Sequence, residues 1–471
     1  MKRKLFLLPV VFTFFVLCGC TLAPKYTKPS SPVPSQWPTG SSYQEAVTVS
    51  PALTAPELPW REFITDNNLQ IIIEAALKNN RDLKIAAVNV EKARAYYGIS
   101  RAELLPSVNA SGSMYKEQVP GDLSSTGSTM TTEKYSVNLG ISSWEIDFFG
   151  RIRSLKDRAL EQYLATQEAH RIAQISLISA VAQAYLVLAA DRENLKMATS
   201  TLETQEAVYK LIHKRYDAGI ISELDVKRAQ IQVYAARGDV ARYKQLTAQD
   251  ENFLNLLTGS ATTEKLLPKD LRSVSIPKDF SPGLLSDVLL LRPDILAAEH
   301  QLKAANANIG AARAAFFPRI ALTTTIGTAS TELSGLFKAG QGTWTFAPQI
   351  VMPIFDARTW SAYDVTKAER EISIAQYEKA IQTAFREAAD ALAEKSMVDQ
   401  RVSAQQSLVD AIAETYRLAN ARYTKGIDSY LSVLDAQRSL YAAKQGLTML
   451  QLAKVNNRIV LYKTLGGGKN N

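Results

Sequence analysis

The chain has 471 residues, of which 46% are hydrophobic and 21% charged, and its formal net charge is +8. This balance is typical of a folded protein, and the length allows one large unit or two to three ordinary domains. No segment concentrates Lys and Arg on one stripe, which argues against nucleic-acid binding. Both cysteines lie within the first twenty residues, which excludes a Cys-based metal site in the body of the chain.

Residues 1–19 have the features of a secretion signal peptide. Three basic residues at 2–4 precede an apolar run, 5–17, that is too short to span a bilayer. The run ends in Leu17-Cys18-Gly19-Cys20, which resembles the bacterial lipobox, whose last cysteine is lipidated. An ordinary signal peptide with two incidental cysteines is the alternative. Cleavage before Cys20 removes the three positive charges, which lowers the net charge from +8 to +5, and leaves one cysteine, so no disulfide is expected.

The stretch 21–60 is rich in Pro and Ser and is predicted to be an extended leader. No later stretch has the ~20 apolar residues of a membrane helix, so a membrane crossing would have to use strands.

The remaining chain is a tandem duplication. Asp82 recurs 212 residues later as Asp294, and the stretch 216–226 recurs 207 residues later as 423–433. A unit of about 210 residues is far longer than a solenoid repeat.

Each half is predicted to contain one helix, two strands, a long helix and a shorter helix. In the first repeat, 66–258, the helices are 66–105, 151–218 and 222–257, and the strands are 107–119 and 135–147. In the second repeat, 283–465, the helices are 283–317, 354–425 and 429–465, and the strands are 319–329 and 343–355. Residues 259–282 link the repeats, and 466–471 form a tail.

The long helices are the strongest architectural signal. At 1.5 Å per residue the segment 151–218 is ~100 Å long, more than a globular domain needs. The two shorter helices of each half sum to about the same length, so each chain would supply four rods. Heptad spacing in both halves predicts coiled-coil packing, although the core of a plain helical bundle accounts for the same spacing. These positions are Leu188, Leu195, Leu202, Tyr209 and Tyr216, and Val402, Val409, Tyr416 and Tyr423.

The predicted strands alternate apolar with polar or small residues and are long enough to cross a bilayer at a tilt. Four strands cannot close a barrel, and a sheet cannot leave its edges in lipid, so the chain must oligomerise. Two copies would give eight strands, whose interior is filled by side chains. Three copies would give twelve strands and a bore.

Several motifs carry a family resemblance. They are the lipobox, 80–83 (Asn-Arg-Asp-Leu), 144–151 (Trp-Glu-Ile-Asp-Phe-Phe-Gly-Arg), 292–295 (Arg-Pro-Asp-Ile), 312–318 (Ala-Arg-Ala-Ala-Phe-Phe-Pro) and 434–440 (Leu-Asp-Ala-Gln-Arg-Ser-Leu). On these the sequence resembles the outer-membrane factor (TolC-like) family, and within it the lipoprotein branch of resistance-nodulation-division (RND) multidrug efflux pumps, the OprM type.

The resemblance implies an α+β membrane protein: a homotrimer whose twelve-stranded outer-membrane β-barrel continues into an α-helical coiled-coil barrel in the periplasm. It also implies that residues 20–65 form a lipidated N-terminal leader and equatorial segment, with an equatorial belt built partly from 40–65 and 259–282.

The implied function is the exit duct of a tripartite pump, which passively conducts drugs and is closed at its periplasmic tip until an adaptor engages it. The implied partners are a periplasmic adaptor (membrane fusion) protein, an inner-membrane RND transporter and outer-membrane lipid. No enzyme activity and no cofactor beyond a lipid on Cys20 are expected. A type I secretion duct, a pore-free periplasmic coiled-coil lipoprotein and a pump adaptor remain alternatives.

The resemblance also implies site residues at the periplasmic tip. The adaptor-docking turns are Gly219, Ile220, Ser222, Gly426, Ile427 and Ser429, whose glycines are also predicted helix C-caps. The gate comprises Leu431 and Asp435, which share one helix face, and Arg438, a candidate partner of Asp435. Asp225 and Tyr423 form a latch, or Asp225 only completes a capping box with Ser222. His170, His213 and His300 are scattered and have no metal-ligand spacing.

Overall fold

The computed structural model describes residues 21–43, 54–280 and 286–468, so the predicted signal peptide and Cys20 lie outside the described residues. The chain forms two compact units. The strand unit comprises residues up to 30, 89–166 and 297–377, and the helical unit comprises 31–88, 167–296 and 378–471.

The strand unit contains one antiparallel sheet of four strands in the order β1-β2-β3-β4. The strands are β1 (Val108–Val119), β2 (Met130–Glu145), β3 (Arg319–Ser330) and β4 (Gly342–Val351). All four predicted strands are confirmed, and all but two of their boundaries agree with the prediction to within two residues. β2 begins at Met130 because the β-branched Thr131 and Thr132 pair with β1. β4 ends at Val351 because this residue pairs with Arg319, the first residue of β3, and its partner strand extends no further.

The sheet is bent where β2 faces β3. The register shifts between Ile141 and Trp144, and Ser143 in this bulge has a positive φ of 54°. The backbone N–H of Ser143 donates to Oγ1 of Thr323 at 3.1 Å, which satisfies a group that the bulge removes from the ladder. On the same pair of strands, a Cβ at Gly140 would collide with the backbone of Thr324, so only glycine permits this close approach.

The residues that directly follow Cys20 are fastened to α7 (Pro293–Ala314) in the strand unit. Asn306 donates to the carbonyl oxygen of Pro24 at 2.8 Å, and Arg313 donates to that of Leu22 at 3.2 Å. Gly310 lets the chain pass, because a Cβ there would meet Ala23 at 2.8 Å. The described leader residues 21–43 form no helix, and the first of them lie at the end of α7 that leads into β3.

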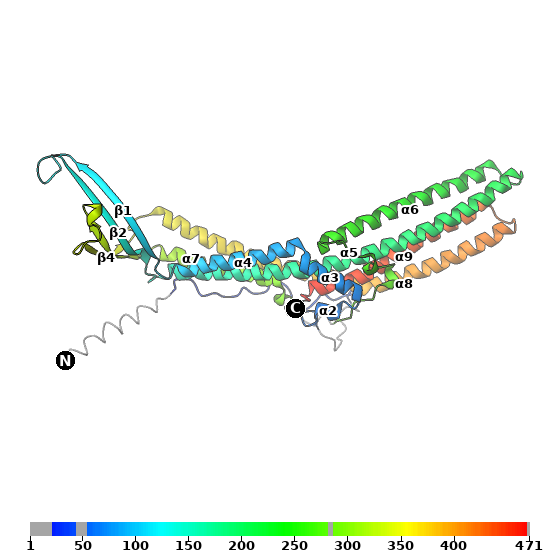
Figure 1. The fold of residues 1–471 in the computed structure, drawn as a ribbon. Helices are drawn as coiled ribbons and strands as arrows, with labels where there is room; N and C mark the ends of the chain where they lie inside the picture. Colours follow the sequence, from blue (N-terminus) through cyan, green and yellow to red (C-terminus); the bar gives the residue numbers. More distant parts are fainter. Residues whose placement is uncertain (1–20, 44–53, 281–285, 469–471) are drawn as a thin grey trace. The chain divides into compact units, whose positions relative to one another are not determined.

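The long helices agree with the sequence prediction to within three residues at each end. They are α5 (Arg151–Asp217), α6 (Glu223–Thr258), α8 (Ala357–Thr424) and α9 (Tyr430–Thr464). In the helical unit α5 and α6 form one antiparallel hairpin and α8 and α9 form another (Figure 1).

The first helix of the first repeat was predicted as one element, which is wrong. It is divided into α3 (Asn67–Asn79) and α4 (Arg81–Ala102). Asn80 has extended backbone angles (φ −61°, ψ 132°), and its Oδ1 accepts the N–H of Leu83 at 2.9 Å. The Asn80 side chain therefore caps the second helix and separates it from the first.

The corresponding helix of the second repeat is also divided. The 3₁₀ segment η3 (Ser286–Leu291) precedes α7, which starts at Pro293, a residue suited to the first helical position. α7 ends at Ala314, three residues before the predicted end. Residues 283–285 of this prediction lie outside the described residues.

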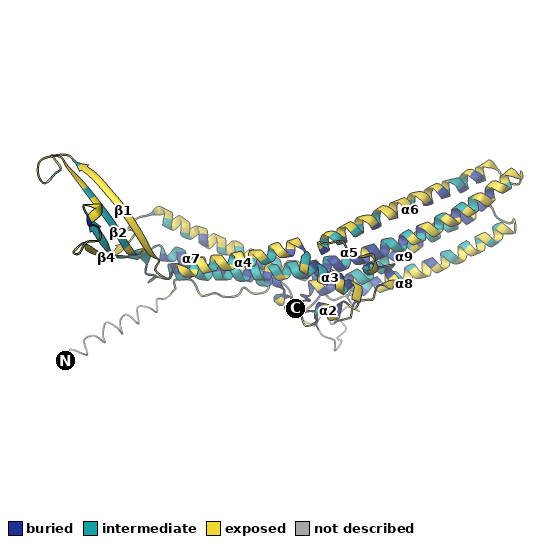
Figure 2. Ribbon diagram, viewed as in Figure 1, coloured by how far each residue is buried: buried dark blue, intermediate teal, exposed yellow. Residues whose placement is uncertain are grey.

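Each of α2 (Trp60–Phe63) and α3 buries one apolar face in the core of the helical unit, whereas much of α6 is exposed (Figure 2). The ring of Phe63 stacks on Tyr462 with centroids 4.0 Å apart, and Phe280 meets both rings edge-on. The Tyr462 hydroxyl donates to the carbonyl oxygen of Leu58 at 2.6 Å. The leader, the linker between the repeats and the last helix thus share one core.

One sequence expectation about apolar stretches was wrong. An 18-residue window of α5 is apolar enough, with a mean hydropathy of 1.8, to cross a membrane by length and composition. However, 61% of this window is buried inside the protein, so we interpret it as a core segment. Val181, Leu188 and Ala189 of this helix are fully buried.

Candidate functional site

The sheet has an apolar face that the described chain leaves uncovered. The strand registers place the alternating apolar residues of β2, β3 and β4 on one face, together with Met114 of β1. They are Met114, Val137, Leu139, Ile141, Ile320, Leu322, Ile326, Trp344, Phe346 and Ile350. Trp344 and Phe346 are 78% and 63% exposed, so this face would cost free energy in water.

The opposite face of the sheet carries Asn, Ser, Thr and Gln. Its members include Asn109, Ser111, Ser136, Asn138, Thr325, Thr343, Thr345 and Gln349. Among the described strands, β1 and β4 each have a partner on one side only. A sheet with one apolar face, one polar face and two free edges matches part of a membrane barrel and not a solvated sheet.

The two hairpin turns of the helical unit are built alike. Gly219 and Gly426 both have φ of +73°, which favours glycine. The N–H of Gly219 donates to the carbonyl oxygen of Tyr216 at 2.8 Å, and that of Gly426 donates to Tyr423 at 2.9 Å. The prediction that both glycines are helix C-caps is confirmed.

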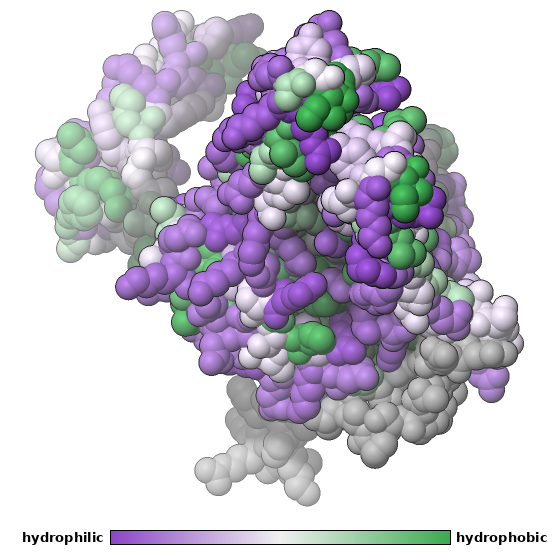
Figure 3. Space-filling model, turned by 90° about the vertical axis from the view of Figure 1, so that its right-hand side faces the viewer, coloured by the Kyte–Doolittle hydropathy of each residue, from purple (hydrophilic) through white to green (hydrophobic). Residues whose placement is uncertain are grey.

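The surface around these turns carries a few exposed apolar side chains among polar ones. Ile220 and Ile427, which follow the glycines, are exposed, as are Ser222 and Ser429. Viewed towards this end, the surface is mostly hydrophilic, with small hydrophobic patches (Figure 3). The predicted docking residues of both turns are therefore accessible in the isolated chain.

The ends of the two hairpins share a hydrophobic cluster, which we call the tip core. Its buried members are Ile212, Val226 and Ala229 of the first hairpin and Tyr430, Val433 and Leu434 of the second. The turns at Gly219 and Gly426 are thus held at the same end of the helical unit.

The three predicted gate residues lie on the face of α9 that points away from the tip core. Leu431 is exposed, and the side chains of Asp435 and Arg438 are 64% and 62% exposed. Nη1 of Arg438 lies 3.9 Å from Oδ1 of Asp435, so the two side chains are within ion-pair distance in the isolated chain. In the isolated chain these side chains have no packing role, since Val433 and Leu434 supply the buried face.

The predicted capping box at Ser222 is not formed as expected. The Ser222 hydroxyl donates to Oδ2 of Asp225 at 2.9 Å and accepts no backbone N–H. Arg228 lies 3.7 Å from the same carboxylate. Asp225 is therefore bound locally, and among the described residues no hydrogen bond joins it to Tyr423, its predicted latch partner.

Tyr423 instead contacts Arg215 of the other hairpin. Nη1 of Arg215 donates to the Tyr423 hydroxyl at 3.1 Å, and its guanidinium lies 5.7 Å from the centre of the ring. Arg215 was not among the residues predicted from the sequence. The duplication contains the signal that could have found it, since Arg215-Tyr216 recurs as Arg422-Tyr423.

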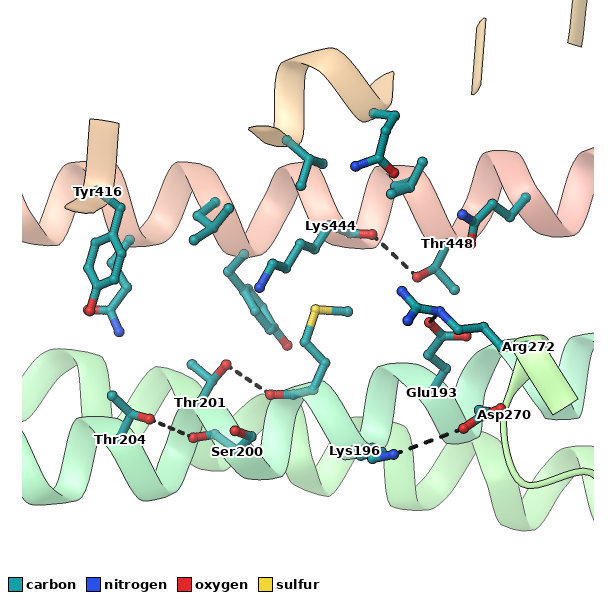
Figure 4. A pocket seen from close by; sticks show the side chains of 18 residues that line it. Glu193, Lys196, Ser200, Thr201, Thr204, Asp270, Arg272, Tyr416, Lys444 and Thr448 are labelled. Carbon is teal, nitrogen blue, oxygen red and sulfur yellow. Dashed lines mark hydrogen bonds and ion pairs between the residues drawn. The ribbon is translucent and has the colours of Figure 1, made fainter. Parts of the chain in front are cut away.

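Next to the tip core, a groove of about 570 Å³ lies between the two hairpins, with α5 on one wall and α8 and α9 on the other (Figure 4). Its charges are largely compensated. Lys196 is 4.0 Å from Asp270, and Arg272 is 3.8 Å from Glu193. Lys444 of α9 also lines the groove, and no ion pair among the described residues compensates its charge, so the groove is polar with one positive charge left over.

The histidines lie apart from one another. His213 pairs with Asp217 at 3.0 Å, and His300 pairs with Glu161 at 2.6 Å. His170 is half-buried on α5. Within the described parts of the chain, no group of three or more His, Cys, Asp or Glu side chains is placed to hold a metal ion.

A four-stranded sheet with an apolar exposed face and two long helical hairpins from a duplicated chain define a subunit of an outer-membrane channel. Residues 72–260 and 284–467 match the outer membrane efflux protein family, and the chain belongs to this family. It is accordingly an outer-membrane efflux channel protein.

Two relatives from Pseudomonas putida illustrate the similarity. The chain is 46% identical to the probable efflux pump outer membrane protein TtgC and to the antibiotic efflux pump outer membrane protein ArpC. Each alignment covers 98% of this chain and 95% of the relative.

Solved structures of this fold agree. A membrane protein from Pseudomonas aeruginosa is 38% identical, with a TM-score of 0.89, over 96% of this chain and 99% of the other. The open state of the Neisseria gonorrhoeae MtrE outer membrane channel is 36% identical, with a TM-score of 0.85, over 96% and 99%.

Proposed function

We propose that this protein is the passive exit duct of a tripartite RND-type efflux pump, which conducts drugs and other small molecules across the periplasm and outer membrane. The observation that carries this proposal is the sheet, which joins an exposed apolar face, a polar face and two free edges. Such a sheet is satisfied in lipid only when copies of the chain close it into a barrel around a polar bore. The duct itself needs no catalytic group, cofactor or bound metal.

The barrel is a trimer in this proposal. Two copies would place eight strands around an interior that side chains fill, whereas three copies give twelve strands and leave a bore. β1 of one chain would pair with β4 of the next, and the polar face would line the channel. The hairpins of three chains would form the periplasmic tube.

The gate of the duct is the exposed face of α9 at the tip. In a trimer Leu431 becomes a ring of three apolar side chains, which gates by dewetting, and Asp435 becomes a ring of carboxylates, which favours cations. Arg438 sets the charge of that ring through its pairing with Asp435. Asp225 and Tyr423 hold neighbouring helices in the closed state, and Arg215 orients the Tyr423 hydroxyl.

The turns at the tip are the docking site of the periplasmic adaptor. Two similar turns, each with an exposed isoleucine after a glycine, give every chain two equivalent contact points. Engagement of these turns would move α8 and α9 against α5 and α6 and so open the gate. The inner-membrane transporter supplies the substrate and the energy.

The chain is anchored by a lipid on Cys20 after removal of residues 1–19. The attachment of residues 22–24 to the sheet-proximal end of α7 supports this, because it places the start of the mature chain beside the membrane-facing strands. A single lipid binds a membrane only weakly, so the barrel remains the main attachment of the chain to the membrane.

The decisive experiment measures both the assembly of the trimer and its transport activity. Outer-membrane fractions are expected to contain a heat-modifiable trimer, and the purified protein is expected to give channels in planar bilayers. A strain that lacks this protein should regain drug resistance when the intact chain is expressed with its adaptor and transporter. A soluble elongated rod without channel activity would contradict the proposal.

A further inference from the structure

Two acidic side chains face each other between α5 and α6. The carboxyl groups of Asp191 on α5 and Asp250 on α6 lie within hydrogen-bonding reach of one another. Oδ2 of Asp250 is buried and accepts no hydrogen bond from any described donor. Two carboxylates cannot share a hydrogen bond unless one of them carries a proton.

The surroundings do not neutralise this pair. Asn194, one turn along α5, is only 5% exposed, and its side chain hydrogen-bonds Asp191 while its own Oδ1 lacks a donor. The charged and titratable groups around the pair come from four elements. They are Arg192 on α5, Asp239, Arg242, Tyr243 and Glu251 on α6, Glu264 in η1 (Glu264–Leu266) and Tyr441 on α9.

The two cations in this group have other commitments. Arg192 lies 2.7 Å from Glu251 and 2.9 Å from Glu264, so it does not reach the pair. Arg242 attracts Asp191 only through space, and its guanidinium lies 5.5 Å from the ring of Tyr243. Glu251 adds a further negative charge near Asp250.

The proton balance follows from this geometry. Burial, and then the charge of Asp191, raise the pKa of Asp250 from 3.8 to about 7. Burial also raises the pKa of Asp191. The pair titrates as a unit, so it holds one proton in acid and loses it around neutrality.

We propose that Asp191 and Asp250 form a proton-operated fastener between α5 and α6, closed while the pair shares a proton and loosened when both carboxylates are charged. The neighbouring bridges Arg192–Glu251 and Arg237–Glu206 hold the same two helices at any moderate pH. Deprotonation therefore weakens the contact between α5 and α6 only near the pair. By the helix rise, Asp191 lies roughly 40 Å along α5 from the turn at Gly219. The periplasmic side of a membrane channel follows the pH of the medium more closely than a cytosol does, so the fastener would report external acidity.

The sign of the stability effect is fixed. The folded chain holds the proton of Asp250 more tightly than the unfolded chain, whose carboxyl has a pKa near 3.8. The stabilisation is fully present below the unfolded pKa and is lost as the pH rises towards about 7, the folded value. Above that pH the two charges repel without further change.

The test uses the full chain in lipid nanodiscs and the variant Asp250→Asn, which keeps the shape of the side chain and can donate to Asp191 at any pH. Hydrogen exchange of α6 is compared between the two proteins at the same pH, so intrinsic exchange rates cancel. At about pH 8 the amides near Asp250 should exchange at least about threefold faster in the wild type, and at about pH 5.5 the ratio should be near one. Glu203→Gln, which removes an exposed carboxylate from α5, is the matched control and should give a ratio near one at both values.

An infrared titration of the wild type alone keeps the proposal testable if the variant does not fold. A protonated-carboxyl band should disappear around neutrality in the wild type. No band should titrate in that range in Asp250→Asn, and in Asp191→Asn the midpoint should move to lower pH, because the charge of Asp191 is removed while Asp250 stays buried. The proposal is overturned if no such band titrates, or if the exchange ratio between wild type and Asp250→Asn is the same at both pH values. The inference does not depend on the gating role of the tip.

Discussion

The guanidinium of Arg292 donates a hydrogen bond of 2.7 Å to the backbone carbonyl of Thr464, at the end of α9. In the first repeat, Asn80 donates through Nδ2 to the carbonyl of Leu257, near the end of α6, at 2.9 Å. The donors are 212 residues apart and the acceptors 207, the two offsets of the duplication. In both repeats, a side chain therefore donates a hydrogen bond to a free carbonyl group at the C-terminal end of the shorter hairpin helix, α6 or α9. The donor is an asparagine in the first repeat and an arginine in the second.

This joint makes a prediction for stability. Arg292 is buried and also bonds Asp294 and Glu387, so Arg292→Ala removes a bond to α9 and leaves two partly exposed carboxylates unpaired. We expect this variant to lower the free energy of unfolding by roughly 2–4 kcal/mol. The loss is smaller than for a fully buried ion pair because both carboxylates reach solvent. Thermal unfolding and limited proteolysis at the end of α9 would measure it.

The first repeat provides the comparison for this variant. Asn80→Ala loses a cap on α4 and a neutral hydrogen bond, so its cost should be smaller, about 1–2 kcal/mol. Equal effects of Arg292→Ala and Asn80→Ala would argue against a special contribution from the guanidinium.

The proposed gate predicts a change in conductance. Leu431→Ala together with Asp435→Ala widens the apolar ring and removes the carboxylate ring, so single-channel conductance in planar bilayers should rise by at least about twofold. Leu408→Ala, on an exposed part of α8, is the control and should conduct like the wild type. An unchanged conductance in the double variant would remove these residues from the gate.

The contact between the hairpins predicts a coupled pair. Arg215→Ala and Tyr423→Phe each remove the 3.1 Å hydrogen bond, so each should increase the open probability. Because both changes break the same bond, the double variant should add little to either single one. Arg422→Ala is the matched control, since Arg422 occupies the equivalent position but pairs with Asp428 in its own turn. Fully additive effects of Arg215→Ala and Tyr423→Phe would show that the two residues act separately.

Local signals in the sequence predicted much of this fold. Alternation located four strands, and the glycines at 219 and 426 located the ends of the long helices, because one residue in the left-handed region ends a helix by itself. The helix break at Asn80 escaped prediction because its side chain is held by Leu257, 177 residues away in the sequence. The pair Asp191–Asp250 and the contact Arg215–Tyr423 depend on the registers of packed helices, which spacing within one helix does not reveal.

The lipid anchor gives a prediction independent of the channel. Cys20→Ser should abolish metabolic labelling of the mature protein with palmitate, whereas Cys18→Ser, which alters a residue on the cleaved side, should leave labelling intact. Because the barrel also holds the chain in the membrane, the unlabelled variant should still reach the outer membrane. Labelling that persists in Cys20→Ser would place the modification elsewhere.

The two faces of the sheet predict opposite tolerance at neighbouring positions of β4. Phe346 lies on the apolar face and Thr345 on the polar face. An arginine on the lipid side of a barrel costs about 2–4 kcal/mol near the middle of the bilayer, whereas the lumen solvates it. Phe346→Arg should therefore reduce the yield of assembled trimer in the outer membrane, and Thr345→Arg should assemble normally but alter ion selectivity. Similar assembly defects in both variants would mean that the face we assign to the channel is not solvated. The proposed barrel, with the polar face inside and the apolar face towards lipid, would then be wrong.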